Sequence, residues 1–255
     1  MQHPPRRSMH VASATSAVVA ALLAAASLGA ALLDAGDADA KGKGCPEHMV
    51  SIHGKYCVDA FEASVVELLP GKKTRRHSPF VPVAGLDVKA VSQRGVKPQA
   101  YISQVEAEKA CENAGKRLCT DDEWKTACRG KSPTLFPYGD ERKDGYCNDA
   151  GVSSFNLYYG AGGEPPKEMY TWDNMNDPRL NQLEGTLAPT GHFKKCKNGF
   201  GAYDMVGNVH EWTKSGAFRG GYYLDTHING DGCDYRTTAH NATYHDYSTG
   251  FRCCK

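Results

Sequence analysis

Two short segments rich in apolar residues, 49–52 and 56–59, predict a β-hairpin. A His-Gly pair at 53–54 separates them and favours a turn. Such a hairpin would place Cys45 near Cys57. We therefore expect two short strands in this part of the chain, with a disulfide between the two cysteines.

Helical spacing of apolar residues begins after Ser103. Ser103 and Glu106 have the spacing of a capping box, and apolar residues then recur every three or four positions as far as Gly115. The same reasoning predicts a second helix over about 122–128, which ends at Gly130. These are the two clearest helices in the sequence.

Most of the remaining chain lacks a regular apolar pattern. Turn residues predominate from 130 to 195, and the basic hexad at 72–77 is expected to be a solvated loop. We expect one loop-rich α+β domain over residues 45–255, with little regular secondary structure. Further short strands are predicted at 203–205, 211–213, 217–219 and 249–253.

The first forty residues have the pattern of an export signal. Two arginines precede an apolar run over 11–33, and a small-x-small triplet ends at Ala40. The run is nearly long enough for a retained membrane anchor, but its alanines and serines and the aspartates after it favour cleavage. We therefore expect a signal peptide over residues 1–40 and no later transmembrane span.

Charge and cysteine content narrow the possible partners and compartments. The formal net charge of +1 is too small to favour nucleic acid or an acidic membrane surface as a partner. The ten cysteines, an even number, suit an oxidising compartment. We expect an exported protein of the periplasm, the cell surface or the secreted fraction, with disulfides that supplement its core.

Four motifs resemble those of the formylglycine-generating-enzyme, or sulfatase-modifying factor, family. Residues 115–130 (GKRLCTDDEWKTACRG) are similar to G-K-R-L-P-T-E-A-E-W … R-G, with Cys119 where proline is usual. Residues 199–212 (GFGAYDMVGNVHEW) are similar to N-x-x-G-L-Y-D-M-x-G-N-V-W-E-W. Residues 219–221 match the start of R-G-G-S-W, and 250–252 match a closing G-F-R. Because these motifs occur in the family's order, the chain is identified as a member.

The resemblance implies an α+β fold related to the C-type lectin domain, with few helices, short strands and long ordered loops. In that fold the first helix is tied to the last strand, and the matching positions are Cys111 and Cys253. Cys128 matches a second disulfide position, for which Cys233 is the nearest partner. The pairing of cysteines cannot be deduced from their spacing. The remaining pairs, Cys119 with Cys254 and Cys147 with Cys196, are therefore put forward without support from the resemblance.

The resemblance also implies a chemistry for which this chain lacks the residues. Family members that form formylglycine carry two cysteines just after R-G-G-S-W, which bind Cu(I), a metal that soft thiolates select. Here the segment continues YYLDTHINGDGC, with Asp225 or Thr226 at the first cysteine position. Cys233 lies near the second position, but it suits a disulfide better. We therefore expect that the chain does not form formylglycine.

An alternative is a sulfur-directed oxidoreductase that uses Cys233 with a histidine site around His227 and His240. Related family members hold nonhaem iron with histidines, and imidazole with carboxylate suits iron or copper. Asp225 and His245 belong to the same stretch. No helical His-x-x-x-His spacing is present, so surface or hydrogen-bonding histidines are the favoured interpretation.

Calcium is the metal that the resemblance favours. The family's G-N-V-W-E-W loop holds a structural Ca²⁺, and the matching donors are the side chains of Asp204 and Glu211 and the backbone carbonyls of Gly207 and Val209. All four donors are oxygens, which suit a hard cation. The competing interpretation is a calcium-free turn held by hydrogen bonds of Asn208 and Glu211.

The function is expected to depend on displayed loops rather than on a nucleophile. The sequence has no recognisable catalytic serine context and no phosphate-binding glycine loop. Tyrosine, asparagine and aspartate are frequent over residues 222–247. Because such loops on a disulfide-pinned platform suit peptides or glycans, we expect a noncatalytic, exported binding or scaffold domain with a protein, peptide or glycan ligand.

Overall fold

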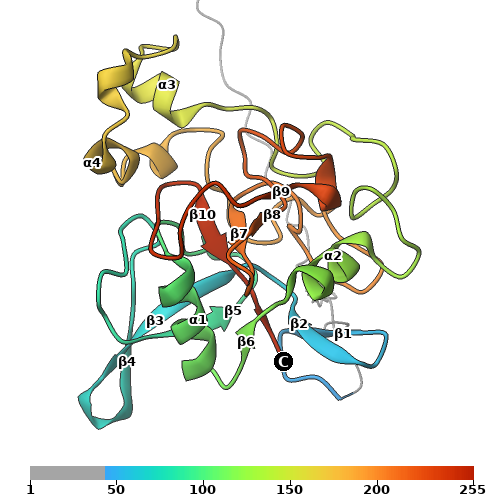
Figure 1. Ribbon diagram of the computed structural model, residues 1–255. Helices are drawn as coiled ribbons and strands as arrows, with labels where there is room; N and C mark the ends of the chain where they lie inside the picture. Colours follow the sequence, from blue (N-terminus) through green and yellow to red (C-terminus); the bar gives the residue numbers. More distant parts are fainter. Residues whose placement is uncertain (1–43) are drawn as a thin grey trace, which may run out of the picture. The chain divides into compact units, whose positions relative to one another are not determined.

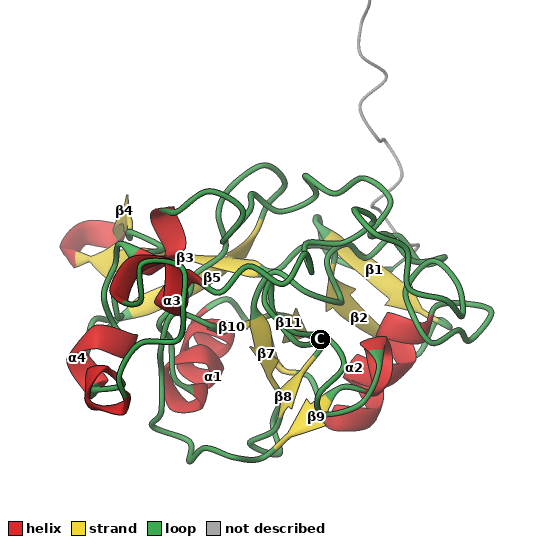
Figure 2. Ribbon diagram, turned by 90° about the horizontal axis from the view of Figure 1, so that it is seen from above, coloured by secondary structure: helices red, strands yellow, loops and turns green. Residues whose placement is uncertain are grey.

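The structure is a computed structural model that describes residues 44–255. The expected signal peptide at residues 1–40 lies outside the described residues. The described part contains three small sheets and four short α-helices (Figure 1). Loops connect these elements and make up much of the ribbon in Figure 2. The predicted loop-rich α+β class is confirmed.

The first sheet brings both ends of the described chain together. Its strand order is β1 (Met49–Ile52), β2 (Tyr56–Asp59), β11 (Cys253–Cys254) and β6 (Arg117–Leu118). β1 and β2 pair antiparallel, with Val50 opposite Val58, and Cys45 is bonded to Cys57. The predicted hairpin is therefore confirmed, and the C-terminal strand pairs against it.

Both predicted helices are present, and each begins at a capping box. α1 (Gln104–Asn113) follows Ser103, whose hydroxyl accepts from the backbone N–H of Glu106, while the Glu106 carboxylate accepts from the Ser103 N–H. α2 (Asp121–Arg129) starts in the same way after Thr120. Each box satisfies two N–H groups that a helix start leaves without an intrahelical partner.

Disulfides fasten both helices to the end of the chain. Cys253 is bonded to Cys111 of α1, and Cys254 is bonded to Cys119, which lies two residues before α2. All ten cysteines of the chain are paired. The structure forms the five pairs put forward above, of which the other three are Cys45 with Cys57, Cys128 with Cys233, and Cys147 with Cys196.

The second sheet carries parts of three of the four motifs on neighbouring strands. Its order is β10 (Thr249–Phe251), β7 (His210–Trp212), β8 (Phe218–Arg219) and β9 (Arg236–Thr237), with β10 parallel to β7. The strand predicted at 203–205 is wrong, because Tyr203 forms only an isolated bridge with Lys197. Asp204 has a φ of +54°, which takes the chain out of the extended conformation.

The third sheet contains the basic hexad. β3 (Ala63–Leu69) is its central strand, between β4 (Lys73–Arg76) and β5 (Val88–Ser92). The prediction of a loop at 72–77 is therefore wrong for most of the hexad. An exposed edge strand tolerates charged side chains, and Arg75 lies opposite Glu67 of β3 and forms an ion pair with it.

Two short helices occur where the sequence predicted only loops. α3 (Ser154–Tyr159) and α4 (Trp172–Met175) begin at hydroxyl caps supplied by Ser153 and Thr171. They lie together at one end of the described part, away from β1 and β2 in both views (Figures 1 and 2). Helices this short do not complete enough turns to produce a recognisable apolar period.

A buried aromatic cluster supports the loop that follows β8. Tyr101, Phe155, Tyr223 and Tyr247 belong to this cluster. The Tyr223 hydroxyl lies 2.8 Å from the hydroxyl of Ser154 and donates to the side-chain oxygen of Asn181 at 2.9 Å. These contacts tie the loop to α3, so the chain beyond β8 has a fixed platform beneath it.

Candidate functional site

The loop after β8 turns at two positions where neighbouring backbone atoms leave room only for glycine. Gly220 and Gly221 have φ values of +78° and +68°. A Cβ on Gly220 would lie 2.6 Å from the carbonyl oxygen of Met205, and one on Gly221 would lie 2.2 Å from that of Asp225. Because those contacts are too short for a Cβ, the Gly-Gly pair fixes the path of residues 222–225.

A pocket of about 350 Å³ opens beside this loop, and we call it the aromatic pocket. Rings form much of its wall, and acidic and hydroxyl groups lie between them. Met175, at the end of α4, also contributes, so the wall combines segments that are distant in sequence. The rings and polar groups of this wall belong to His210, Phe218, Tyr222, Tyr235, His240, Tyr244 and Tyr247, with Asp225, Asp246 and Ser248.

A chain of hydrogen bonds passes through His210 in the pocket wall. The Ser248 hydroxyl donates to Asp246 Oδ1 at 2.7 Å, so the Ser248 oxygen accepts from His210 Nδ1 at 3.2 Å. His210 Nε2 then accepts from the Tyr235 hydroxyl at 3.2 Å, and that hydroxyl accepts from the amide of Asn229. Burial lowers the pKa of His210 to about 3, which keeps the ring neutral.

This order of donors and acceptors does not activate Ser248 for nucleophilic attack. Activation requires a base that accepts the serine proton. Here the hydroxyl proton is directed to Asp246, and His210 donates to the hydroxyl oxygen. The hydrogen bonds therefore position the histidine ring and the pocket wall.

Asp225 or Thr226 stands where the resemblance places the family's first cysteine, and the Asp225 carboxylate accepts hydrogen bonds within its own loop. Oδ1 accepts from the backbone N–H groups of His227 and Ile228 at 2.9 and 3.0 Å. It also lies 3.2 Å from Nδ1 of His227. An aspartate that accepts from N–H groups two and three residues ahead stabilises a turn, so Asp225 has a structural role in the loop.

Trp172 extends the aromatic surface beyond the edge of the aromatic pocket. The rings of His240 and Tyr244 are stacked with centroids 3.7 Å apart, and Trp172 of α4 packs edge-on against Tyr244 at 5.7 Å. Trp172 is 50% exposed, and Ile228 at the rim is 75% exposed. Exposed apolar groups beside a concave aromatic surface are typical of a binding site.

The residues of the alternative oxidoreductase site make other contacts and do not form a metal-binding group among the described residues. Cys233 is bonded to Cys128, the side chain of His227 is exposed, and His240 is engaged by Tyr244. Burial lowers the pKa of His240, which favours its neutral form. Within residues 44–255, no group of three or more His, Cys, Asp or Glu side chains is arranged to hold a metal ion.

The predicted calcium loop contains a buried ion pair. Both carboxylate oxygens of Glu211 accept from the fully buried Arg252 guanidinium at 2.6 Å, and Oε2 also accepts from the Trp124 indole N–H at 2.6 Å. Because a cation already engages both oxygens, the Glu211 side chain does not fit calcium coordination in this arrangement. Calcium binding by the other three expected donors stays a prediction.

Asn208 holds the turn of this loop and also contacts an acid that the sequence did not single out. Its Oδ1 accepts from the amide of Asn148 and the N–H of Ala188, each at 2.9 Å, and its Nδ2 donates to Glu62 Oε2 at 2.6 Å. Burial and two neighbouring carboxylates raise the pKa of Glu62 well above its usual value. No local pattern marks Glu62, which lies 146 positions from Asn208.

The sequence indicated a tyrosine-rich stretch over residues 222–247, which lines the pocket, but not most of the pocket's polar groups. No local pattern marks His210, and α4 was not predicted. One local signal was available at Asp246 and Ser248. Asp246 Oδ1 accepts from the Ser248 N–H at 2.8 Å, which is a turn typical of Asp two residues before Ser.

Comparison with known proteins agrees with the motifs. The family model described as Sulfatase-modifying factor enzyme 1-like domain matches residues 29–255. The formylglycine-generating enzyme of Mycobacterium tuberculosis is 32% identical over 123 residues, which cover 48% of this chain and 35% of that protein. The inactive C-alpha-formylglycine-generating enzyme 2 of Bos taurus is 28% identical over 169 residues, which cover 61% of this chain and 49% of that protein.

The chain thus spans about a third to a half of the length of these relatives. Among solved structures, the Major Tropism Determinant I1 Variant aligns with a TM-score of 0.46 at 10% identity. That alignment covers 82% of this chain and 52% of the other.

Proposed function

Because the chain belongs to the sulfatase-modifying factor enzyme 1-like family, we propose that it is a noncatalytic member whose aromatic pocket binds a peptide or a glycan. The observation that carries this proposal is the state of its cysteines. Formylglycine formation in the family depends on a thiolate pair, whereas all ten cysteines of this chain lie in disulfides. Asp225 or Thr226 occupies the first of the two cysteine positions, and the Asp225 carboxylate accepts from N–H groups of its own loop.

The position of the aromatic pocket supports a binding role. It lies beside the loop that follows the Arg-Gly-Gly motif, the segment that carries the two cysteines in formylglycine-forming relatives. The relatives also include a protein named as inactive. Loss of the thiolate chemistry with retention of the scaffold leaves a recessed surface that is able to bind a ligand.

The chemistry of the pocket suits ligands that combine apolar faces with hydroxyl or amide groups. Tyr244 and His240 line the pocket as a stacked pair, and this pair offers aromatic surface to aliphatic side chains or sugar C–H groups. Asp246 and Ser248 lie in the same wall and place hydrogen-bonding groups near those rings. Peptides and glycans both offer this combination.

An exported location is part of the proposal. Five disulfides in one small domain favour an oxidising compartment such as the periplasm, the cell surface or the secreted fraction. Within residues 44–255, the structure has no helix with the length and apolar content needed to cross a membrane.

Ligand binding can be followed through Trp172. It is 50% exposed and contacts Tyr244, whereas Trp124 and Trp212 are buried. We would screen immobilised peptides and glycans and then titrate the hits while recording tryptophan fluorescence. Tyr244→Ala should weaken binding at least about tenfold, because it removes the ring on which His240 stacks.

Tyr146→Ala is the matched control, because it removes a half-buried tyrosine outside the aromatic pocket. It should bind within about twofold of the unaltered protein. Equal affinity of the Tyr244 and Tyr146 variants, or failure of every peptide and glycan to bind, would count against the proposed site.

The noncatalytic part of the proposal has a separate test. The protein would be incubated with cysteine-containing peptides, Cu(I) and oxygen, and the peptides analysed by mass spectrometry for formylglycine. We expect no product, because no cysteine of the chain is free to bind the metal or the substrate. Product formed over several turnovers would show that the protein is an enzyme.

Calcium remains a proposal with its own measurement. If Asp204, Gly207 and Val209 hold the ion, plasma mass spectrometry should find about one calcium per chain, and a chelator should lower the melting temperature. A calcium-free protein with an unchanged melting temperature would leave the loop held by Asn208 and by the pair of Glu211 with Arg252. Copper or iron near one per chain would instead favour the alternative oxidoreductase.

A further inference from the structure

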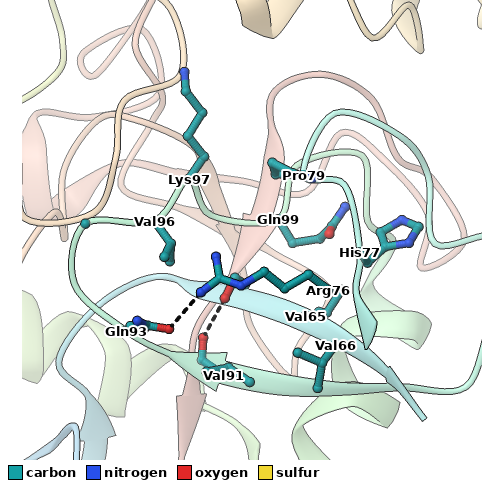
Figure 3. A pocket seen from close by; sticks show the side chains of 12 residues that line it. Val65, Val66, Arg76, His77, Pro79, Val91, Gln93, Val96, Lys97 and Gln99 are labelled. Atoms are coloured by element: carbon teal, nitrogen blue, oxygen red, sulfur yellow. Dashed lines mark hydrogen bonds between the residues drawn. The ribbon is translucent and has the colours of Figure 1, made fainter. Parts of the chain in front are cut away.

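A second cavity, of about 390 Å³, lies on the third sheet and shares no lining residue with the aromatic pocket (Figure 3). The sheet supplies Ser64 and Val66 from β3, Val91 from β5 and Arg76 from β4. The segment 93–99 forms much of the remaining wall. We call this space the sheet cavity.

Part of the sheet cavity's wall is aliphatic, beside the polar side chains of Gln93 and Gln99 that also line it. Val66 and Val91 lie on the side of the strands, and Val96 faces them from the other side (Figure 3). Such a surface favours a ligand with an aliphatic group, because burial of apolar surface is worth roughly 25 cal/mol per Å².

The sheet cavity is also positively charged. Arg76 and Lys97 line it, and no aspartate or glutamate does so. The ammonium of Lys97 points away in Figure 3 and donates to the carbonyl oxygen of Leu187. The nearby acid, Glu67, is paired with Arg75 and His77. Arg76 is therefore the cation available to a ligand.

Arg76 has unused hydrogen-bonding capacity. Its side chain extends across the sheet cavity toward Gln93, and its contact with Gln93 Oε1 is long, at 3.5 Å (Figure 3). It forms no ion pair within residues 44–255. A guanidinium has five N–H donors, two of which match the two oxygens of a carboxylate.

We propose that the sheet cavity binds a carboxylate attached to an aliphatic group, with Arg76 as the anion-binding residue. One planar guanidinium matches a planar monoanion in charge and shape. A phosphate dianion would need a second cation directed into the space, and the valines favour a ligand with an aliphatic group over a sulfated sugar. The inference is independent of the function proposed for the aromatic pocket.

Two kinds of molecule carry this chemistry: the carboxyl terminus of a peptide that ends in an aliphatic residue, and a free branched-chain acid. N-acetyl-valine and isovalerate represent them. N-acetyl-valine amide is the neutral counterpart of N-acetyl-valine. Acetate is the counterpart of isovalerate that lacks the branched aliphatic group. Binding would be measured by titration calorimetry and by chemical-shift changes in isotopically labelled protein.

The deciding comparison uses two variants of β4. Arg76→Gln removes the cation in the sheet cavity, whereas Lys73→Gln removes one positive charge from the same strand on its opposite face. We expect Arg76→Gln to weaken binding of N-acetyl-valine or isovalerate at least about tenfold, the loss of one charge-assisted hydrogen bond. Lys73→Gln should stay within about twofold.

The probes test the remaining features. The neutral amide should bind at least about tenfold more weakly than N-acetyl-valine, and acetate more weakly than isovalerate. A preference for N-acetyl-valine over isovalerate would identify a peptide terminus as the ligand, and the reverse would identify a free acid. Equal effects of the two variants, equal binding of acid and amide, or no binding of either acid would overturn the proposal.

Discussion

Glu62 carries a fully buried carboxyl group with one oxygen that has no partner among the described residues. Its raised pKa means that the folded protein keeps a proton that the unfolded chain releases above about pH 4.5. The stability that this group contributes is therefore complete below that pH and is lost as the pH rises through the folded pKa. Because Glu62→Gln cannot ionise, we expect it to be more stable than the unaltered protein at pH 8, with the difference vanishing near pH 4.

Urea unfolding between pH 4 and pH 8, with a chelator present, measures this difference. Glu164→Gln removes an exposed carboxylate and is the matched control, for which no pH-dependent difference is expected. A Glu62→Gln protein that is less stable than the unaltered protein at pH 8 would show that the ionised carboxylate is needed in the fold.

His210 should make stability depend on pH in the opposite direction. Its pKa of about 3 in the folded state lies below its ordinary value of 6.5, because the ring is buried. The unfolded chain therefore gains a proton first, and stability is lost as the pH falls from 6.5 toward 3, with a limiting slope of about 1.4 kcal/mol per pH unit. His210→Asn should flatten this slope in urea unfolding, whereas His192→Asn, at an exposed position, should leave it unchanged.

The disulfides differ in how deeply they are buried, and this difference sets their expected contribution at the level of elements. Cys111 with Cys253 joins α1 to β11 and is fully buried, whereas Cys45 with Cys57 spans 12 positions beside one hairpin. Because Cys119 with Cys254 already closes almost the same length of chain, loss of the Cys111–Cys253 bond alone frees only a short loop, and the chain-entropy model gives roughly 3 kcal/mol for either pair. Replacing both cysteines of a pair by alanine should therefore destabilise the protein more for the α1 pair, because it also leaves a cavity in the core.

Urea unfolding of the two double variants gives this order directly. The buried position of Cys111 and Cys253 adds a packing loss to an entropic loss that is similar for the two pairs, and this packing loss sets the expected order. A larger loss for the hairpin pair would mean that strand pairing at the N-terminal end of the described chain depends on its disulfide more than on the hairpin itself.

Elements with local determinants are the ones that the sequence predicted. α1 and α2 start at capping boxes whose partners are three residues apart, and β1 and β2 are joined by a short turn. β4 was missed because its charges are typical of a loop, and its extended conformation depends on pairing with β3. α3 and α4 were missed because they are too short to show a period.

At the scale of the whole molecule, the order of the motifs predicted the family and the loop beside the aromatic pocket. Contacts between distant segments were not predictable. Parallel pairing of β10 with β7 places Gly250 opposite Glu211, so Arg252 reaches the acid that the sequence assigned to calcium. Trp172 likewise meets Tyr244 only through the fold.

Disulfide formation affects the whole molecule, because β11 and β6 have only two residues each and the disulfides of Cys253 and Cys254 hold them in place. The redox state of the compartment in which the chain folds is therefore important. Protein recovered from an oxidising export route should show fewer than one free thiol per chain when denatured without reductant. Full reduction should lower its urea midpoint, because the unfolded chain regains the freedom that the disulfides restrict. A protein made in a reducing cytosol with ten free thiols and the same midpoint would show that the disulfides are dispensable, which would remove the main support for export.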